Sequence, residues 1–363
     1  MKEIICLSNE PWSAAPGRTQ QLVTRIRDTK ILYFEPAASL WDSSWKKPGR
    51  KVRPNVTVYT LPPVLIPNER LTHLFLLAQQ RLGRFVQEKA ARSRFHQPLL
   101  WTTNPTHVHL LDHLEYSAVV YDCDREWEQF PGPWEGTLAH TADLTFTASQ
   151  QLKERLSPCS ANIALLPNGT NFQLFSGHTG TQPTPRLSHL SGPVLGWAGT
   201  IHPDLNLEPL LHAAKTRPDW TFVLLGNQHK NNPWLSKLRQ RSNVVILPGC
   251  PLLEVPDYLD RCDVLLNFLR SSQSYTDIIP SRIYEYLSTG KPIVSMLWPD
   301  QVEHFPDVIY GAFSPEEFTY LCAQALDEDR RWVCQRRKGY GQSAAWTNRA
   351  AEVFHILSTA GLL

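Results

Sequence analysis

Several features that identify other classes of protein are missing or scarce in this chain of 363 residues. Its seven cysteines are scattered and odd in number, and none forms a C-x-x-C pair, which favours reduced thiols in the cytoplasm over a disulfide framework or a zinc site. No stretch approaches the roughly 18 apolar residues of a membrane-spanning helix, and the apolar run at the start is too short for a signal peptide. A net charge of +2 gives no global case for a nucleic-acid partner. Because a G-x-G-x-x-G fingerprint is also missing, nothing predicts a nicotinamide or flavin cofactor.

What the sequence does contain is a repeated α/β alternation. Its length and its hydrophobic content of 42% predict two domains, each with its own core. The stretch EIICLS, a loop, a helix over residues 18–27 and the stretch ILYFEP form a strand–loop–helix–strand unit, which is typical of a doubly wound sheet. The alternation restarts at PVLGWAGTI, after a segment at residues 176–193 that is rich in Gly, Ser, Thr and Pro and marks the best domain boundary.

The most informative stretch is DIIPSRIYEYLSTGKPIVS, residues 277–295. Pro280 suits the first turn of a helix, and Gly290 suits the left-handed residue that follows a helix end. A helix amino terminus that follows a polar loop is a ready-made anion site. Arg282 in the first turn would add a fixed positive charge there.

This stretch resembles the donor-site signature of glycosyltransferases with the GT-B fold, especially those of family 4. Such enzymes carry two acidic residues with seven residues between them, and Asp277 and Glu285 meet this spacing, with Asp where the family usually has Glu. The resemblance implies that Glu285 binds the ribose hydroxyls and that Asp277 contacts the donor sugar. The turn, helix and strand alone would suit any α/β protein; both acids together with Arg282 and G-K-P favour the donor site.

The resemblance also sets the expected architecture. It implies two Rossmann-like domains with parallel sheets that face an interdomain cleft, and a final helix that crosses back to the first domain. We expect an acceptor-side domain at residues 1–178, a nucleotide-sugar domain at 192–342 and the crossing helix at 343–363.

Glycine positions in the second half predict backbone close to the donor. Gly196 and Gly199 in PVLGWAG let the backbone approach a ligand, and their N–H groups could hold a phosphate. Gly226, at the end of the predicted strand TFVLLG, is also expected near the donor. Many family 4 members carry Arg and Lys after the glycine that corresponds to Gly199, whereas this chain has Thr200, His202 and Asp204. We therefore assign the diphosphate charge to Arg282. The full set of expected donor-binding residues is Glu285, Arg282, Ser281, Gly199, Thr200, Gly226 and, from the P-N-G turn, Asn168.

A segment of the first half also resembles the family, with departures. YDCDREWEQFPG matches a pattern Y-D-C-V-D-D-W-x-x-F-P-G at its start and end, but Asp124 stands on the usual Val, and Arg125 and Glu126 stand on the Asp pair. We predict a strand up to Tyr121 and then a polar loop, which is either an ordinary surface loop or part of the reaction site. Asp122 and Glu126 are the candidate general bases if the reaction inverts the anomeric configuration; the resemblance implies retention.

The acceptor side has weaker signals. Asn9, Trp12 and Arg18 follow the first strand and are expected at a cleft rim, although Arg18 is equally compatible with an ordinary surface position. The predicted helix at residues 70–96 is amphipathic and basic, and a basic segment lies at 46–53. Such a helix either packs on the core with a solvated face or lies on an anionic membrane.

Together these features predict a metal-independent hexosyltransferase without a cofactor, cytoplasmic or peripheral at the inner face of a membrane. It would move sugar from a UDP- or GDP-sugar to a hydroxyl of a saccharide or lipid-linked saccharide, in polysaccharide biosynthesis. A sugar-nucleotide epimerase and a catalytically silent sugar-nucleotide-binding partner remain as alternatives. A nicotinamide oxidoreductase is the least favoured alternative, because its glycine fingerprint is missing.

Overall fold

A computed structural model describes residues 2–13, 15–64, 72–127, 132–177, 187, 190, 192–270, 277–296, 301, 304–329 and 331–363. The chain divides into two compact units, of which the first comprises Met1–Pro167 and Trp346–Leu363 and the second Asn168–Ala345. The first unit therefore ends before residue 178, and its returning segment begins after residue 343. Most of the predicted boundary segment at 176–193 lies outside the described residues.

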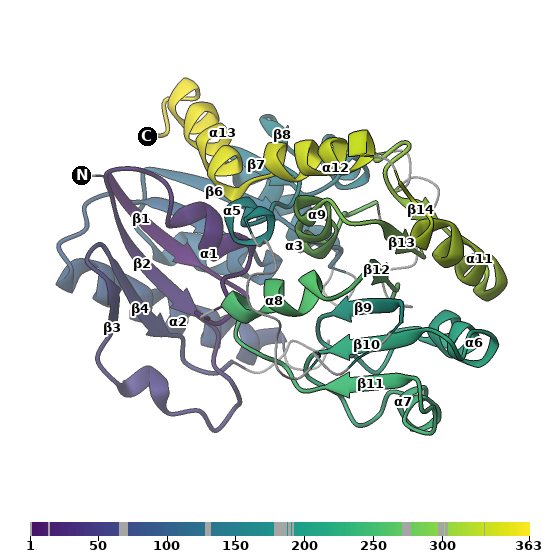
Figure 1. Ribbon diagram of the computed structural model, residues 1–363. Helices are drawn as coiled ribbons and strands as arrows, with labels where there is room; N and C mark the ends of the chain where they lie inside the picture. Colours follow the sequence, from purple (N-terminus) through teal and green to yellow (C-terminus); the bar gives the residue numbers. More distant parts are fainter. Residues whose placement is uncertain are drawn as a thin grey trace. The chain divides into compact units, whose positions relative to one another are not determined.

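The first unit is built on an eight-stranded sheet in the order β3-β4-β2-β1-β5-β6-β7-β8 (Figure 1). All neighbouring strands are parallel except β3 and β4. Because the inner strands are covered on both faces, they read as continuous apolar runs rather than as an alternation. The strands are β1 (Lys2–Leu7), β2 (Thr29–Glu35), β3 (Arg50–Arg53), β4 (Val56–Thr60), β5 (Leu99–Thr102), β6 (Ala118–Cys123), β7 (Leu144–Thr147) and β8 (Ile163–Leu165).

Helices cover this sheet, and the last of them comes from the far end of the chain. In α13, Trp346, Val353 and Leu357 are buried in the same apolar cluster as Ile4 and Leu22. The C-terminal segment therefore contributes to the first unit's core. The helical segments of this unit are α1 (Arg18–Val23), η1 (Ser44–Lys46), α2 (Thr72–Arg92), η2 (Pro105–His113), α3 (Gly132–Thr141), α4 (Gln150–Leu156) and α13 (Trp346–Thr359).

The second unit has a six-stranded, wholly parallel sheet in the order β11-β10-β9-β12-β13-β14. Numbered within the unit, this is the doubly wound order 3-2-1-4-5-6 of Rossmann folds. Its strands are β9 (Val194–Ala198), β10 (Thr221–Leu225), β11 (Val244–Leu247), β12 (Val264–Asn267), β13 (Ile293–Ser295) and β14 (Tyr310–Gly311). Its helical segments are α5 (Phe172–Ser176), α6 (Glu208–Thr216), α7 (Leu235–Leu238), η3 (Leu252–Glu254), α8 (Val255–Asp260), α9 (Ser281–Thr289), α11 (Pro315–Leu326) and α12 (Arg331–Ser343).

Three expectations about local structure are corrected. The helix expected at residues 18–27 ends at Val23, and Asp122 lies inside strand β6 rather than in a loop. The C-terminal helix expected from residue 343 begins at Trp346 as α13, and it follows a helix that was not expected, α12; the two are separated where the Thr170 amide donates to the Ala344 carbonyl at 2.9 Å. Among the described helices, none combines the length and the apolar character that crossing a bilayer requires.

Candidate functional site

The strand order of the second unit locates a ligand site. From β9 the chain winds to β10 and β11 on one side, and from β12 to β13 and β14 on the other. In doubly wound sheets, ligands bind beyond the carboxyl ends of the strands at this switch point. Gly199 directly follows β9, and Gly226 follows the neighbouring β10. Two of the glycines that the sequence singled out therefore lie at the carboxyl edge of the sheet.

Both glycines have a backbone that side chains disfavour. Gly199 and Gly226 each have φ of +155°, and a Cβ on Gly226 would overlap the backbone of Gly199. The two backbones can therefore approach this closely only because neither residue has a side chain. The Gly199 amide donates to the Leu225 carbonyl at 2.9 Å and that of Gly226 to Leu247 at 3.1 Å. Both N–H groups are used within the sheet edge, which argues against the expectation that the Gly199 N–H holds a phosphate, and the contribution of these two glycines is close approach of the backbone.

Helix α9 begins beside these glycines. Pro280 caps it in an extended conformation and Gly290 ends it in the left-handed region with φ of 79°. The Tyr286 hydroxyl accepts from the Ala198 amide at 2.9 Å, which ties the helix to the end of β9. The Asn168 side chain donates to the Ile279 carbonyl at 3.0 Å, just before the helix starts. The predicted N-G turn and the predicted helix start are thus brought together.

Arg282 is the cation at this helix start. Its guanidinium carbon lies 4.6 Å from the ring centroid of Trp197, the stacked arrangement of a cation–π pair. A Cβ on Gly199 would collide with the guanidinium of Arg282, so the charged group lies directly against the glycine turn. The sequence predicted the charge but not the aromatic platform beneath it.

Both predicted acids are shielded from solvent at least in part. Burial raises the pKa of Glu285 to about 7, although the nearby positive charge of Arg282 opposes the shift. Asp277 is also buried, with 6% of its surface exposed. The polar loop at 271–276 that was expected to precede it lies outside the described residues. Thr200 and Ser281 are half-buried neighbours of Gly199 and Arg282 along the chain.

A histidine pair that the sequence analysis did not combine flanks the glycine turn. The rings of His202 and His229 stack with centroids 5.4 Å apart and an interplanar angle of 19°. Parallel pairing of Ile201 with Gln228 brings the two loops together. Burial, followed by the positive charge of Arg270, lowers the pKa of His202. Only strand register reveals this pair, because the two histidines belong to loops after different strands.

In the first unit, two predicted site residues bind each other. Arg18 donates from Nε and Nη2 to the carboxylate of Asp122, at distances of 2.8 to 3.2 Å. Both side chains are buried, with 4% and 0% exposed. Arg18 therefore does not lie at an open rim as predicted, and Asp122 is not a free general base.

The departure at Arg125 forms a second charged group. Arg125 donates to Asp124 from Nε and Nη2, both at 2.8 Å, and from Nη2 to Glu10 at 3.1 Å. Burial and the negative charge of Asp124 raise the pKa of Glu10. Exposed Glu126 pairs instead with Arg155 at 3.2 Å. Phe130 and Pro131 of the same motif lie outside the described residues.

Asn9 and Trp12 are held by the backbone around the end of β1. The Asn9 amide donates to Thr103 Oγ1 at 3.0 Å. The Trp12 amide donates to Glu35 Oε2 at 2.8 Å, and its ring meets Tyr33 edge-on at 5.3 Å. Both side chains remain partly exposed, as a contact with a further molecule would require.

Comparisons with known proteins agree with this architecture. Residues 206–354 match the model of a family described as glycosyl transferase-like. The chain is 24% identical over 253 residues to TuaH of Bacillus subtilis (strain 168), which is named as a teichuronic acid biosynthesis glycosyltransferase. That match covers 63% of this chain and 64% of TuaH, less than two thirds of the relative's length.

Solved structures extend the likeness to the whole chain. Sucrose-phosphate synthase of Thermosynechococcus elongatus has a TM-score of 0.75 at 15% identity, with 99% of both chains covered. The α,α-trehalose 6-phosphate synthase of Burkholderia multivorans reaches 0.77 at 10% identity, again with 99% of both chains. Anabaena HepE, solved with UDP and glucose, scores 0.71 at 15% identity, with 99% of this chain and 100% of HepE covered. At these identities the likeness shows the fold, which is GT-B.

Proposed function

Taking the chain as a glycosyltransferase with the GT-B fold, we propose that it moves a hexosyl group from a UDP-sugar to a hydroxyl of a saccharide or lipid-linked saccharide. One observation carries the proposal: the start of α9, Arg282 and the paired glycine turns meet at the switch point of the second unit. UDP is preferred to GDP because HepE, which shares the fold, was solved with UDP and with UDP-glucose.

In this proposal the diphosphate lies at the amino end of α9. The helix dipole and the guanidinium of Arg282 stabilise the negative charge that develops on the leaving diphosphate. Stacking on Trp197 orients that guanidinium. The collision that a Cβ on Gly199 would make with Arg282 supports the need for glycine there, because the backbone and the guanidinium must approach the same ligand.

Glu285 and Asp277 bind different parts of the donor. Glu285, one turn into α9, accepts hydrogen bonds from the ribose hydroxyls, and this role requires its charged form. Asp277 contacts the donor sugar. Neutral His202, whose pKa is lowered chiefly by burial, donates one hydrogen bond toward the diphosphate, in the loop where many family 4 members carry Arg and Lys. No metal or cofactor takes part in this scheme.

The acceptor side is proposed around Asn9, Trp12 and Glu126 of the first unit. The Arg18–Asp122 pair positions the start of α1 beneath them rather than reacting itself, since Arg18 engages both carboxylate oxygens. We propose that the reaction retains the anomeric configuration, in keeping with the family 4 resemblance. If it inverts, Glu126 is the remaining candidate base among the acids first considered.

A catalytically silent sugar-nucleotide-binding protein is the second candidate. Its support is Arg125, which stands where the family pattern has an acid and is held by Asp124 and Glu10. A transferase would hydrolyse donor slowly and release UDP quickly when an acceptor is present, whereas a binder would release none in either case.

The experiment follows release of the nucleoside diphosphate, which is UDP from UDP-glucose and UDP-galactose and GDP from GDP-mannose, each with and without saccharide acceptors. Acceptor-dependent UDP release that Glu285→Ala abolishes would support the proposal. Matched Glu254→Ala, which changes an exposed acid of the same unit, should leave the release unchanged. Nucleotide binding without release from any donor would favour the silent binder, and equal release with and without acceptor would favour a hydrolase.

A further inference from the structure

The large exposed apolar side chains of the first unit lie mostly on two segments, the loop before η1 and the start of α2. Apart from Phe354 on α13, all those that the structure describes in this unit lie either on the loop before η1 or in the first turns of α2. Trp41 is 94% exposed and Leu40 56%. On α2, Leu74, Leu76 and Leu77 are 54%, 40% and 57% exposed. Scattered exposed apolar residues are normal, but a cluster of this kind marks a surface that binds something.

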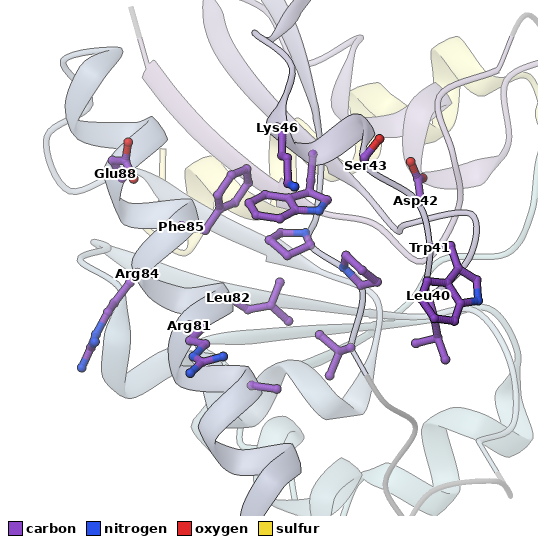
Figure 2. A pocket seen from close by; sticks show the side chains of 15 residues that line it. Leu40, Trp41, Asp42, Ser43, Lys46, Arg81, Leu82, Arg84, Phe85 and Glu88 are labelled. Atoms are coloured by element: carbon purple, nitrogen blue, oxygen red, sulfur yellow. The ribbon is translucent and has the colours of Figure 1, made fainter.

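A hollow of about 670 Å³ lies within the same region, between the loop at residues 40–46, the segment at 62–64 and helix α2. Figure 2 shows Leu40 and Trp41 on one side of it and Leu82 and Phe85 of α2 on the other. Trp45 forms part of the wall and meets Phe85 edge-on at 6.2 Å. The walls are thus apolar and largely aromatic, and two prolines complete them.

Cations surround this apolar region. Lys46, Arg81 and Arg84 line the hollow (Figure 2). Residues 46–53 contain five Lys or Arg and no acid, and of these Arg50 pairs with Glu35 at 2.7 Å. Neither Arg81 nor Arg84 makes an ion pair within the part of the chain that the structure describes. Two acids also line the hollow, and both are engaged: Asp42 accepts from the Ser44 amide at 2.8 Å, and Glu88 pairs with Arg92 at 2.6 Å.

Exposed tryptophan and leucine beside Lys46, Arg81 and Arg84 match the interface of an anionic bilayer. Tryptophan and leucine enter the boundary between headgroups and acyl chains, while basic side chains meet the lipid phosphates. A folded protein partner would have to supply a complementary acidic rim, and a second copy of this chain would place like charges against each other. Charge therefore favours the lipid surface.

We propose that this face of the first unit, with Leu40, Trp41, Leu74 and Leu77 as apolar contacts and Lys46, Arg81 and Arg84 as phosphate contacts, docks on an anionic membrane. The hollow then receives a lipid headgroup between its aromatic wall and the two arginines. Docking does not depend on the proposed transferase activity, because the surface can bind vesicles without any substrate.

The test measures sedimentation of the full chain with vesicles of phosphatidylcholine alone and of equal parts phosphatidylcholine and phosphatidylglycerol. We expect binding to the anionic vesicles only, weakened by salt. Since each basic residue near the surface contributes about five-fold to binding, R81S with R84S should lower the partition coefficient about 25-fold. L74S with L77S should lower it as well, because it removes the apolar contacts while retaining every charge.

A matched control lies in the second unit, where Leu253 is 72% exposed and Lys237 is exposed. L253S with K237S should leave vesicle binding unchanged. Quenching of fluorescence by brominated lipid should fall in W41F, which locates the contact independently. Circular dichroism and UDP affinity of each variant report whether both units remain folded.

Three results would overturn the proposal: no preference for anionic vesicles, equal binding by the R81S/R84S and control variants, or a dimer that the same substitutions dissociate. The last would assign the surface to a second copy of the chain. If the parent chain shows no transferase activity in solution but still binds anionic vesicles, the proposed function is overturned and the proposed membrane docking is not.

Discussion

Arg18 and Asp122, 104 positions apart in the sequence, form a buried ion pair in the first unit, with Arg18 Nη2 at 2.8 Å from Asp122 Oδ1. Arg18 begins helix α1, and Asp122 is the last residue but one of strand β6. Burial raises the pKa of Asp122, while the positive charge of Arg18 opposes the shift. The pair therefore links the start of α1 to the end of β6. In the sheet, β6 lies three strands away from β2, the strand that follows α1 in the chain.

Removing one member of this pair should be costly. We predict that Asp122→Ala lowers the free energy of unfolding by about 3–5 kcal/mol, because it leaves a buried guanidinium without its carboxylate. The double variant Arg18→Met/Asp122→Leu should lose less than the sum of the single changes. Urea denaturation measures both effects. As a control, Asp219→Ala breaks an exposed pair with Arg217 and should produce no measurable loss; a similarly small loss for Asp122→Ala would contradict the role given to the pair.

Alanine substitutions at the glycine turns should reduce stability and UDP binding to different extents. Gly226→Ala should destabilise the second unit by at least about 1–3 kcal/mol, since it combines a strained backbone with overlap against the Gly199 backbone. Gly199→Ala has the same backbone strain but meets the movable end of Arg282 rather than backbone, so we expect it to destabilise the second unit less than Gly226→Ala and to weaken UDP binding. Gly339→Ala, with open space around the new methyl group, is the control. Thermal denaturation and UDP titration separate the two effects, and equal behaviour of the three variants would be inconsistent with the packing described.

The raised pKa of Glu285 predicts that the stability of the second unit depends on pH. This pKa is raised to about 7 chiefly by burial, so the charged form of Glu285 is disfavoured in the fold. Its contribution to stability is therefore present at low pH and lost as pH rises through about 7. Glu285→Gln should accordingly be more stable than the parent at pH 8 and equally stable near pH 5, as measured by urea denaturation.

The same group should control donor binding in the opposite sense. Because the ribose hydroxyls require an accepting carboxylate, UDP affinity of the parent should fall as pH drops below about 7. In Glu285→Gln the affinity should be low and should lack this dependence. A parent affinity that rises steadily toward pH 5 would argue against Glu285 as the ribose ligand.

Local signals in the sequence predicted the helix and strand that form the candidate site of the second unit. Pro280 and Gly290 mark the bounds of α9 by their own backbone preferences, and the strand that follows is a plain apolar run. These features depend on a few neighbouring residues. Gly199 and Gly226 were likewise identified because each follows a strand.

Features that depend on distant partners were missed. Asp122 was expected in a loop because a buried acid is unfavourable without a partner, and that partner is Arg18 in another element. Helix α12 was overlooked because its sequence is polar and contains two glycines. Its buried Arg337 is satisfied by Glu328 at 2.6 Å and by the Val308 carbonyl, neither of which the pattern of α12 itself reveals.

The central claim is that the diphosphate of a UDP-sugar lies against the start of α9 with Glu285 on the ribose, and calorimetric titration of UDP tests it most directly. The account predicts binding to the parent chain at one site, with affinity about ten- to a hundred-fold lower in both Arg282→Ala and Glu285→Ala, as expected for loss of hydrogen bonds to charged groups. Lys237→Ala should bind UDP as the parent does. Unchanged UDP affinity in the Arg282 and Glu285 variants, or no UDP binding by the parent, would contradict it.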